Sequence, residues 1–347
     1  MTISKRSSQT KRVKAASKQA LVVFNPVAKS SSLRRSLLTR IIRELREECG
    51  HSVSLFPIDP QQTIHDLIPL LKPPFELIVV VGGDGTVRFV LAALAECGAK
   101  IPVGIVPFGT ANVLARNLGI LDHGFFASSP ENALTTLKTG RTTSIDLGSM
   151  NGELFAVTAG VGPMSDAFTR PDFREKNMIS LFAYARTMLQ TIGQPPRLFK
   201  ITMDGVSFNV LASGVFVSNV EDLGLGKPPD INELTDGMLS LNILTPHEFK
   251  DYVDIGFRFA VGATDANPPH YVRRVKEVLI EAEPLVPSDA QIPPAGLPPE
   301  AAAMIDGEEF GTTPIHVKVI PQAVHILVPE HSPVFTAQKV VSQEVRI

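Results

Sequence analysis

After its first 19 residues, the chain alternates between two hydrophobic patterns. One is a short, continuously apolar run, as in ALVVF (20–24), the part of ELIVVV (76–81) that follows Glu76, and IPVGIVP (101–107). Runs of this length that are apolar at every position are typical of strands buried on both faces of a parallel sheet. HSVSLF (51–56) is predicted to be a further strand of the same sheet.

The second pattern lies between these runs and repeats every three to four residues, which predicts amphipathic helices. The residues that repeat in this way are Leu37, Ile41 and Leu45 in one segment and Val87, Val90, Leu91 and Leu94 in another. Further helices are predicted over 60–71, over 111–118 and from Pro130 to Gly140. Strands that alternate with helices predict an α/β domain with a doubly wound parallel sheet over residues 20–145.

The pattern changes near residue 145. Two hairpins are predicted there, with turns at Asn151-Gly152 and Asp204-Gly205. Further strand-like runs are GMLSLNIL (237–244), YVRRVKEVLIEAE (271–283), IHVKVI (315–320) and AVHILVP (323–329), and helical runs occupy 177–192 and 247–262. We therefore predict a β-rich antiparallel C-terminal domain over residues 146–328. The chain end, 329–347, could return to the first domain, and the proline-rich segment 283–300 is predicted to be an exposed loop.

Composition narrows the class of protein. The chain has 347 residues, 44% hydrophobic and 20% charged, with a formal net charge of −2. This is an ordinary globular balance and gives no sign of a nucleic-acid partner. The two cysteines, Cys49 and Cys97, lack zinc-type spacing and fit a reducing compartment. No run reaches the roughly 18 apolar residues of a transmembrane helix, so we expect no transmembrane segment.

The first 19 residues carry six basic side chains and no acidic one. We interpret this segment as a disordered, solubilising tail. The alternative is a basic arm that is attracted to anionic lipid headgroups.

Three polar loops follow strands of the predicted parallel sheet. They are Asn25-Pro26, GGDGT (82–86) and PFGTAN (107–112). Because the carboxyl ends of parallel strands lie at one edge of a sheet, we expect the loops to gather at a common binding site. Glycines allow the backbone to approach a ligand closely, and the helix that follows GGDGT directs its positive end at the same place. The loops therefore predict a phosphate site.

Asp84 is the residue in this loop that a simple phosphate site does not explain. A carboxylate beside bare phosphate is unfavourable, but it is expected if Mg²⁺ lies between them or if the aspartate orients a hydroxyl. The alternative is that GGDGT is only a sharp strand-to-helix turn; the second Gly-Thr loop favours the phosphate site. Neither loop has the spacing of a Walker A motif or of a dinucleotide-binding GxGxxG motif.

An ordered set of segments resembles the diacylglycerol kinase catalytic-domain superfamily, which includes bacterial lipid kinases and sphingosine kinases and has NAD kinases as distant relatives. The segments are VVFNP, VVVGGDGTV, PFGTANVLARNLGI, SIDLG, TAGVG, TDGMLSLNIL and MIDGEEF. The resemblance covers about residues 20–330. It implies a two-domain fold with a nucleotide-binding N-terminal domain, ATP in the interdomain cleft, Mg²⁺ as cofactor and a lipid hydroxyl as acceptor.

The resemblance also implies roles for individual residues. Gly82, Gly83, Asp84, Gly85 and Thr86 would form the triphosphate loop, with Asn25, Thr110 and Asn112 as further nucleotide contacts. Asp84 and Asp306 would be catalytic carboxylates, and Glu308 would be the general base. A structural Mg²⁺ would be held by the Asp236 side chain and by the backbone carbonyls of Glu233 and Met238.

The residues themselves leave alternatives to these roles. Asp306-Gly307 has the sequence of a hairpin turn, in which the following glutamates would simply be solvated. Asp146 could be a turn residue or a carboxylate close to the cleft. Two departures from the family pattern also matter: Val113 replaces a frequent aspartate, and Phe56 and Pro57 replace a frequent threonine. Either change could weaken ATP binding.

Our leading functional hypothesis is an ATP-dependent lipid kinase, with diacylglycerol as the first candidate acceptor. We expect a cytoplasmic enzyme that works at the membrane surface and that could form a homodimer. A NAD kinase-like enzyme would share the GGDGT loop and is one alternative. The other is a catalytically inactive module that senses nucleotide or lipid, which the departures at Val113, Phe56 and Pro57 would explain.

Overall fold

The structure is a computed structural model that describes residues 18–26, 31–72, 74–121, 130–162, 196–223, 233–261, 267–284 and 300–334. Three predicted features lie wholly or mainly outside these residues. They are the basic tail, the helix at 177–192 and the proline-rich loop.

The N-terminal half is built on four parallel strands in the order β2-β1-β3-β4. Their bounds are Lys18–Phe24 (β1), His51–Pro57 (β2), Phe75–Gly82 (β3) and Val103–Pro107 (β4). Every residue of β4 and the last six residues of β3 are buried, as expected for central strands covered on both faces. The prediction of a parallel sheet is confirmed.

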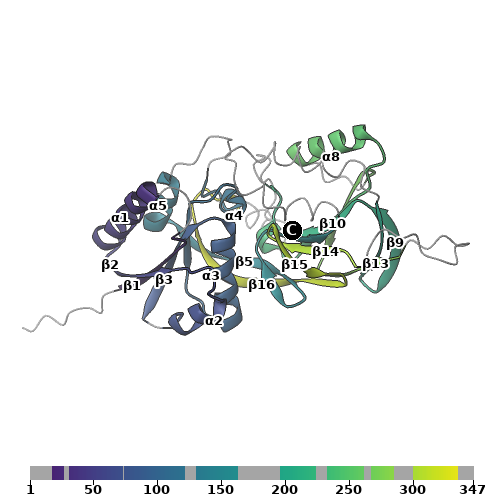
Figure 1. The fold of residues 1–347 in the computed structure, drawn as a ribbon. Coiled ribbons are helices and arrows are strands. Elements are labelled where there is room, and N and C mark those ends of the chain that lie inside the picture. The colour runs from purple at the N-terminus through teal and green to yellow at the C-terminus, as the bar shows by residue number, and fades with distance from the viewer. Residues whose placement is uncertain are drawn as a thin grey trace, which may run out of the picture.

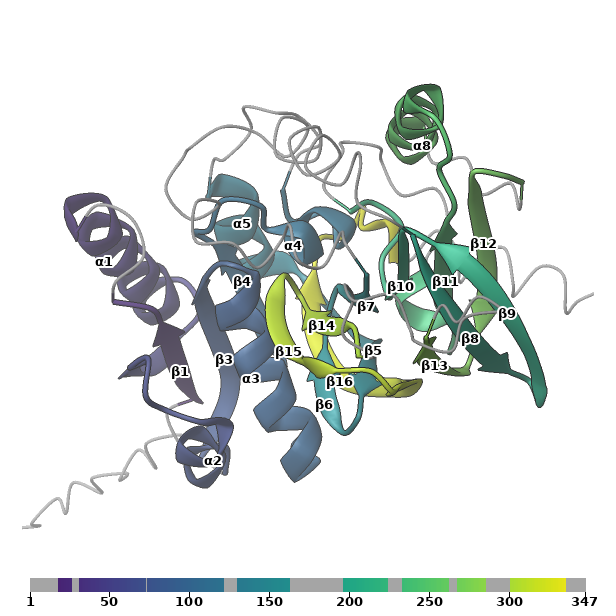
Figure 2. The ribbon, with the colours of Figure 1, turned by 45° about the vertical axis from the view of Figure 1, so that its right-hand side comes forward.

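Helices cover both faces of these strands (Figure 2). On one face α1 (Ser31–Glu47) packs against α5 (Glu131–Thr139), and on the other α2 (Ile64–Leu67) packs against α3 (Asp84–Cys97). The helix predicted over 60–71 is shorter than expected: α2 is one turn and continues as a 3₁₀ helix at Ile68–Leu70. Pro69 explains this change because it has no backbone N–H to donate to an α-helical bond.

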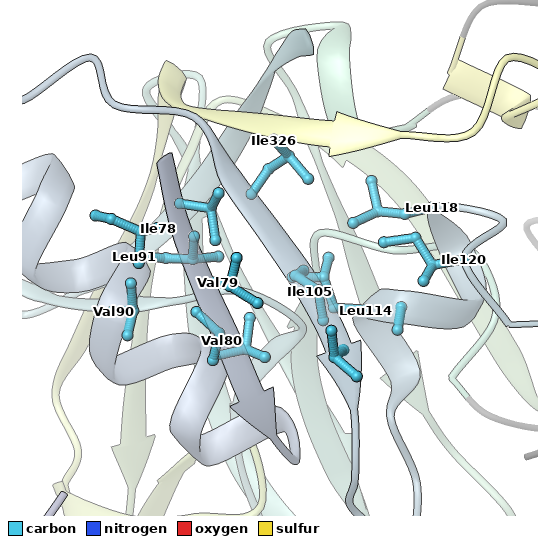
Figure 3. Close-up of a cluster of buried hydrophobic side chains, with 14 of the residues drawn as sticks. Ile78, Val79, Val80, Val90, Leu91, Ile105, Leu114, Leu118, Ile120 and Ile326 are labelled. Atoms are coloured by element: carbon cyan, nitrogen blue, oxygen red, sulfur yellow. The ribbon is translucent and has the colours of Figure 1, made fainter. Parts of the chain in front are cut away.

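The core of this half lies between β3, β4 and the helices that flank them (Figure 3). Ile78, Val80 and Ile105 from the strands are almost fully buried, as are Val90 and Leu91 from α3. The short helix α4 (Val113–Asn117) and the turn after it add further apolar side chains, which are Leu114, Leu118 and Ile120. This packing fixes the starts of α3 and α4, and with them the two glycine loops.

The C-terminal half is a sandwich of two antiparallel layers (Figure 1). One layer continues the N-terminal sheet and contains β5 (Arg141–Met150), β6 (Glu153–Phe155), β8 (Arg197–Met203), β9 (Val206–Ala212), β13 (Glu277–Glu283) and β16 (Ile315–Val328). The other contains β7 (Thr158–Val161), β10 (Gly214–Ser218), β11 (Leu239–Leu244), β12 (His270–Val275), β14 (Ala302–Ile305) and β15 (Glu308–Thr312). A second hydrophobic core fills the space between the layers. The predicted fold class is confirmed.

Both predicted hairpins form, β5–β6 and β8–β9, with positive φ angles at Asn151, Gly152, Asp204 and Gly205. The helix predicted at 247–262 is α8 (Phe249–Val261). None of the helices in the part of the chain that the structure describes is long and apolar enough to span a membrane.

Two strand predictions needed correction. The run 271–283 is not one strand: β12 and β13 belong to different layers. IHVKVI and AVHILVP are not separate strands either, because both lie in β16, which has an irregularity between Ile320 and Val324. β16 pairs with β13 in the β-rich half and then reaches β4 of the N-terminal sheet. β5 pairs with it on both sides of the irregularity, so these two strands connect the halves.

Candidate functional site

The carboxyl ends of the parallel strands lie together, and the glycine loops meet there. In the strand register Phe24 lies opposite Val81, and Gly82 lies opposite Pro107. Asn25, directly after Phe24, therefore lies at the same edge as the GGDGT and PFGTAN loops. Phe56 and Pro57, which replace the family's threonine, end the neighbouring strand β2.

The two glycine loops touch through their backbones. A Cβ atom added to Gly109 would lie 2.5 Å from Gly83 Cα and 2.7 Å from Asn112 Oδ1. A Cβ added to Gly82 would lie 2.6 Å from the Thr86 side chain. These glycines are therefore needed for the two loops to pack closely against each other. Glycine-rich loops at the start of a helix are of the kind that cradles phosphates.

Asn112 closes the PFGTAN loop. Its Oδ1 accepts a hydrogen bond from Gly109 N at 2.9 Å, and its Nδ2 donates to Gly109 O at 3.0 Å. Asn112 has a φ of +48° and is buried, whereas Thr110 is exposed. The amide of Asn112 thus shapes the loop, and Thr110 is the side chain of this pair that solvent or a ligand can reach.

Asp84 joins the two loops. It is the first residue of α3, and its Oδ1 accepts a hydrogen bond from Leu114 N, in α4, at 3.2 Å. Burial raises the pKa of Asp84, and hydrogen bonds from backbone N–H groups, among them those of Leu114 and Val113, oppose the rise. Asp84, for which the sequence predicts a role beside Mg²⁺ and phosphate, therefore also has an observed structural role, which is to tie the GGDGT loop to the neighbouring helix α4.

Glu308 reaches this loop from the β-rich half. It is the first residue of β15, and a Cβ placed on Gly85 would lie 3.6 Å from Glu308 Oε1. The other carboxylate oxygen, Oε2, accepts a hydrogen bond from Arg88 Nη2 of α3 at 2.8 Å. In Figure 2 the β14–β15 hairpin lies beside α3. The predicted base and the predicted phosphate loop are thus brought together, although 220 positions separate Arg88 from Glu308.

Asp306 anchors the hairpin that carries Glu308. Its Oδ2 accepts from Ala156 N, and its Oδ1 accepts from Val157 N and Thr158 N, each at 2.9 Å. Burial raises the pKa of Asp306 to about 6, while these three N–H donors and the charge of Arg88 act in the opposite direction. Both carboxylate oxygens of Asp306 accept hydrogen bonds from backbone N–H groups. Asp306 is therefore placed to hold the β14–β15 hairpin, and with it Glu308, in position.

Asp146 is a buried carboxylate at the junction of the two halves. Its Oδ2 accepts from Gly237 N and its Oδ1 from Gln322 N, both at 2.7 Å. Gln322 lies within the irregular part of β16, with a φ of +49°. Burial raises the pKa of Asp146, and the hydrogen bonds from Gln322 and Gly237 oppose the rise. Asp146 therefore fastens β5 to β16 and to the turn before β11, and it is not a simple turn residue.

The predicted structural metal site contains a guanidinium group. Asp236 Oδ1 accepts from Met238 N at 2.9 Å, and its Oδ2 is paired with Arg274 Nη2. Arg274 Nη1 also donates to Ser240 Oγ at 2.6 Å. Glu233 begins the 3₁₀ helix just before this turn. Among the described residues, no group of three or more His, Cys, Asp or Glu side chains is arranged to hold a metal ion.

This arrangement does not favour a metal at Asp236, because a guanidinium already binds one oxygen of its carboxylate and a backbone N–H binds the other. Ligation by Asp236, Glu233 and Met238 stays a prediction.

Sequence reasoning missed two residues of these clusters, Arg88 and Arg274. Arg88 had a weak local signal, since it lies one helical turn after Asp84 and on the same side of α3. Arg274 had none, because its contact with Asp236 depends on the pairing of β11 with β12.

Two family models match successive parts of the chain. The diacylglycerol kinase catalytic domain matches residues 19–150, and the YegS C-terminal NAD kinase beta sandwich-like domain matches residues 156–328. The diacylglycerol kinase of Bacillus subtilis is 24% identical over 320 residues, which cover 90% of this chain and 97% of that protein. The diacylglycerol kinase of Staphylococcus aureus MRSA252 is 22% identical over 322 residues, covering 90% and 93%.

A solved structure shares the fold. The crystal structure of a diacylglycerol kinase from Bacillus anthracis superposes with a TM-score of 0.66 at 19% identity, over 91% of this chain and 99% of that one. Both halves of the present structure are therefore found together, in the same order, in a known protein. The chain belongs to the diacylglycerol kinase catalytic-domain superfamily, a group of ATP-dependent lipid kinases.

Proposed function

We propose that the protein transfers the γ-phosphoryl group of ATP to a lipid hydroxyl, with diacylglycerol as the acceptor to test first. The observation that carries this proposal is the contact between the two halves. A carboxylate from the β-rich half, Glu308, lies against the glycine loop of the nucleotide half at Gly85. A phosphate held on that loop would be next to a group able to accept a proton, which is what phosphoryl transfer to a hydroxyl requires.

ATP fits the loop side of this site. The backbones of Gly82, Gly83 and Gly109 approach closely, and α3, which has 14 residues, begins there with its positive end. Thr86 and Thr110 lie on the same two loops, and Asn25 lies after β1 at the same edge of the sheet, as further polar groups. Asp84, where the loops join, is the proposed partner of the Mg²⁺ that accompanies ATP. That ion would supply neutralisation of phosphate charge.

Glu308 and Asp306 have different roles in the proposed reaction. Glu308 takes the proton of the lipid hydroxyl. The hydroxyl oxygen forms a bond to the γ-phosphorus, the bond from that phosphorus to the bridging oxygen of ADP breaks, and ADP leaves with the electron pair. Asp306 holds the hairpin so that Glu308 stays at the loop, and it takes no proton from the substrate.

A transfer assay tests the proposal. The purified full chain is given Mg²⁺ and ATP labelled at the γ-phosphorus, and it is offered mixed micelles that contain diacylglycerol, sphingosine or monoacylglycerol. NAD⁺ is a separate acceptor. We expect label in the lipid phase, and higher turnover on anionic than on neutral micelles if the basic N-terminal residues attract the enzyme.

Label on NAD⁺ alone would establish the NAD kinase-like alternative. A folded protein that binds ATP but labels no acceptor would support the inactive sensing module and end the proposal.

Replacing Glu308 by glutamine tests the proposed base. We expect kcat to fall by about 10²- to 10⁴-fold, because the amide cannot accept the proton. ATP affinity should stay within about twofold, since the backbone loop holds the phosphates. Glu309→Gln is the matched control: Glu309 is the next residue of β15, is exposed and points to the opposite face of the strand. Equal turnover in the Glu308 and Glu309 variants would remove Glu308 from its role.

A further inference from the structure

Arg88 joins the two halves at the candidate site but has no part in the function proposed so far. It lies on α3, three residues after Gly85 and one helical turn after Asp84. Its Nη2 donates to Glu308 Oε2 at 2.8 Å, and its positive charge opposes the rise that burial causes in the pKa of Asp306. The guanidinium therefore binds one acidic residue of the DGE segment and acts on the charge of the other, while its backbone belongs to the helix that begins at the GGDGT loop.

One donor of this guanidinium is not satisfied. Arg88 Nε is buried and has no hydrogen-bond partner among the residues that the structure describes. A buried polar group without a partner is unfavourable, and an ion or water that binds at the site is one explanation for such a group. Arginine has five N–H donors in a planar fork, so one edge of the group can bind Glu308 while others bind a phosphate oxygen.

The two oxygens of Glu308 face different neighbours. Oε2 binds Arg88, whereas Oε1 lies nearest the phosphate loop, 3.6 Å from where a Gly85 Cβ would be. Because Arg88 holds one oxygen, it decides which way the other is directed. The Arg88 side chain is also only 21% exposed, which sets it apart from a solvated surface charge.

We propose that Arg88 couples nucleotide binding to the placement of the base: one side of its guanidinium holds Glu308 Oε2, and its remaining donors bind the γ-phosphoryl group. Oε1 is then the atom that meets the acceptor hydroxyl. Arg88 is a positioning residue with respect to Glu308 and a binding residue with respect to ATP. This inference rests on the proposed function for its kinetic part only, because selective binding of ATP over ADP does not require turnover.

The first test measures binding. Calorimetric titration with a non-hydrolysable ATP analogue and with ADP, both with Mg²⁺, gives the preference of each variant for the γ-phosphate. Arg88→Met should lower affinity for the analogue by about tenfold or more and change affinity for ADP by less than about threefold. Arg88→Lys keeps the charge without the fork and should restore part of the preference. Arg46→Met, an exposed arginine of α1, should match the unmodified protein.

The second test measures coupling to Glu308. Arg88→Met should lower kcat by about 10- to 100-fold in the otherwise unmodified chain. In a Glu308→Gln background it should add little to the loss of kcat, because the base it positions is already absent, yet it should still weaken binding of the ATP analogue. Effects of residues that act as a unit are not additive.

The outcomes separate this inference from the proposed function. If the unmodified protein transfers no phosphate but Arg88→Met still loses its preference for the analogue over ADP, the function fails and the γ-phosphate contact stands. Arg88→Met could instead change thermal stability but leave kcat and the preference for the ATP analogue over ADP within about twofold. The ion pair would then only stabilise the contact between the halves, and the inference would be wrong. If the unmodified protein binds neither nucleotide, both the proposed function and the inference about Arg88 are wrong.

Discussion

At the scale of single residues, the acidic side chains divide into anchors and a candidate base. The anchors are Asp84, Asp146 and Asp306, whose carboxylates accept hydrogen bonds from backbone N–H groups of other segments. Glu308 differs, since its carboxylate accepts a hydrogen bond from the Arg88 side chain and lies at the glycine loop. The sequence places all four residues in turns or at strand ends. Residue type and spacing alone do not distinguish an anchoring carboxylate from a base, because anchoring depends on which distant backbone N–H groups the side chain meets in the fold.

Replacing Asp306 by alanine tests the anchor role. Three backbone N–H groups would lose a charged acceptor, so we expect the free energy of unfolding to fall by about 2–4 kcal/mol. kcat should fall as well, because the β14–β15 hairpin no longer holds Glu308 at Gly85.

The matched control is Asp204→Ala. Asp204 begins another Asp-Gly turn, is exposed, and has a φ of +51° against +48° for Asp306. Its substitution measures the cost of alanine at positive φ without the anchor. Equal losses of stability and unchanged kcat in the two variants would show that Asp306 is only a turn residue.

At the scale of elements, the prediction succeeded where neighbouring residues in the sequence mark a turn, loop or strand. It failed where the bounds of a strand depend on which other strands it pairs with. The glycine loops, the hairpin turns and the buried strands are marked by residue types at fixed spacing. The split of 271–283 into β12 and β13 has no such mark, because no glycine, proline, asparagine or aspartate stands at the break, which falls at Lys276. There, Lys276 O accepts a hydrogen bond from Val319 N of β16, a contact formed only once both layers are in place. Likewise, the continuity of β16 through Pro321 depends on the buried Asp146, which binds Gln322 N.

The turn before β11 provides the prediction at this scale. If Arg274 supplies the cation that neutralises Asp236, unfolding of the unmodified protein without nucleotide should shift by less than about 1 °C between EDTA and Mg²⁺. Arg274→Met should leave Asp236 unpaired beside the buried Asp146, which lowers the melting temperature. Millimolar Mg²⁺ should then raise it by about 2–4 °C through binding to the exposed carboxylate.

Arg273→Met is the control for that experiment, because Arg273 is the neighbouring residue of β12 and is exposed. It should remain insensitive to Mg²⁺. Stabilisation of the unmodified protein by Mg²⁺ in the absence of nucleotide would instead support metal ligation by Asp236, Glu233 and Met238.

At the scale of the whole molecule, the fold has two hydrophobic cores joined by two long strands. One core lies under the parallel strands and the other fills the β-rich sandwich, while β5 and β16 run through both. The class of each half could be predicted from hydrophobic periodicity. The connection between the halves through β5 and β16 could not be predicted in this way, since it depends on the hydrogen bonds of Asp146 and on a local irregularity in β16. The candidate site lies where the halves meet, so its geometry depends on both cores being folded.

His270 makes the stability of the β-rich half depend on pH. It is 2% exposed, its Nε2 lies 2.8 Å from Asn242 Oδ1, and its charged neighbours are Arg258 and Asp254 of α8. Burial, with the charge of Arg258, lowers the pKa of His270 from 6.5 to about 4, while Asp254 opposes the shift. The unfolded chain therefore binds a proton at a higher pH than the folded chain does. Neutral His270 therefore contributes fully to the free energy of unfolding above pH 6.5. This contribution, about 3 kcal/mol, is lost as the pH falls toward 4.

The raised pKa of Asp306 acts in the opposite direction between pH 4 and 6, so the total stability of the protein hides the effect. The quantity to measure is the difference in unfolding free energy between the unmodified chain and His270→Gln, in which the contribution of Asp306 cancels. This difference should move by about 3 kcal/mol in favour of the variant between pH 7 and pH 4, in denaturant titrations that follow the β-rich half. A difference that stays constant across this range would mean that His270 titrates alike in the folded and unfolded chains, and the burial argument would then fail.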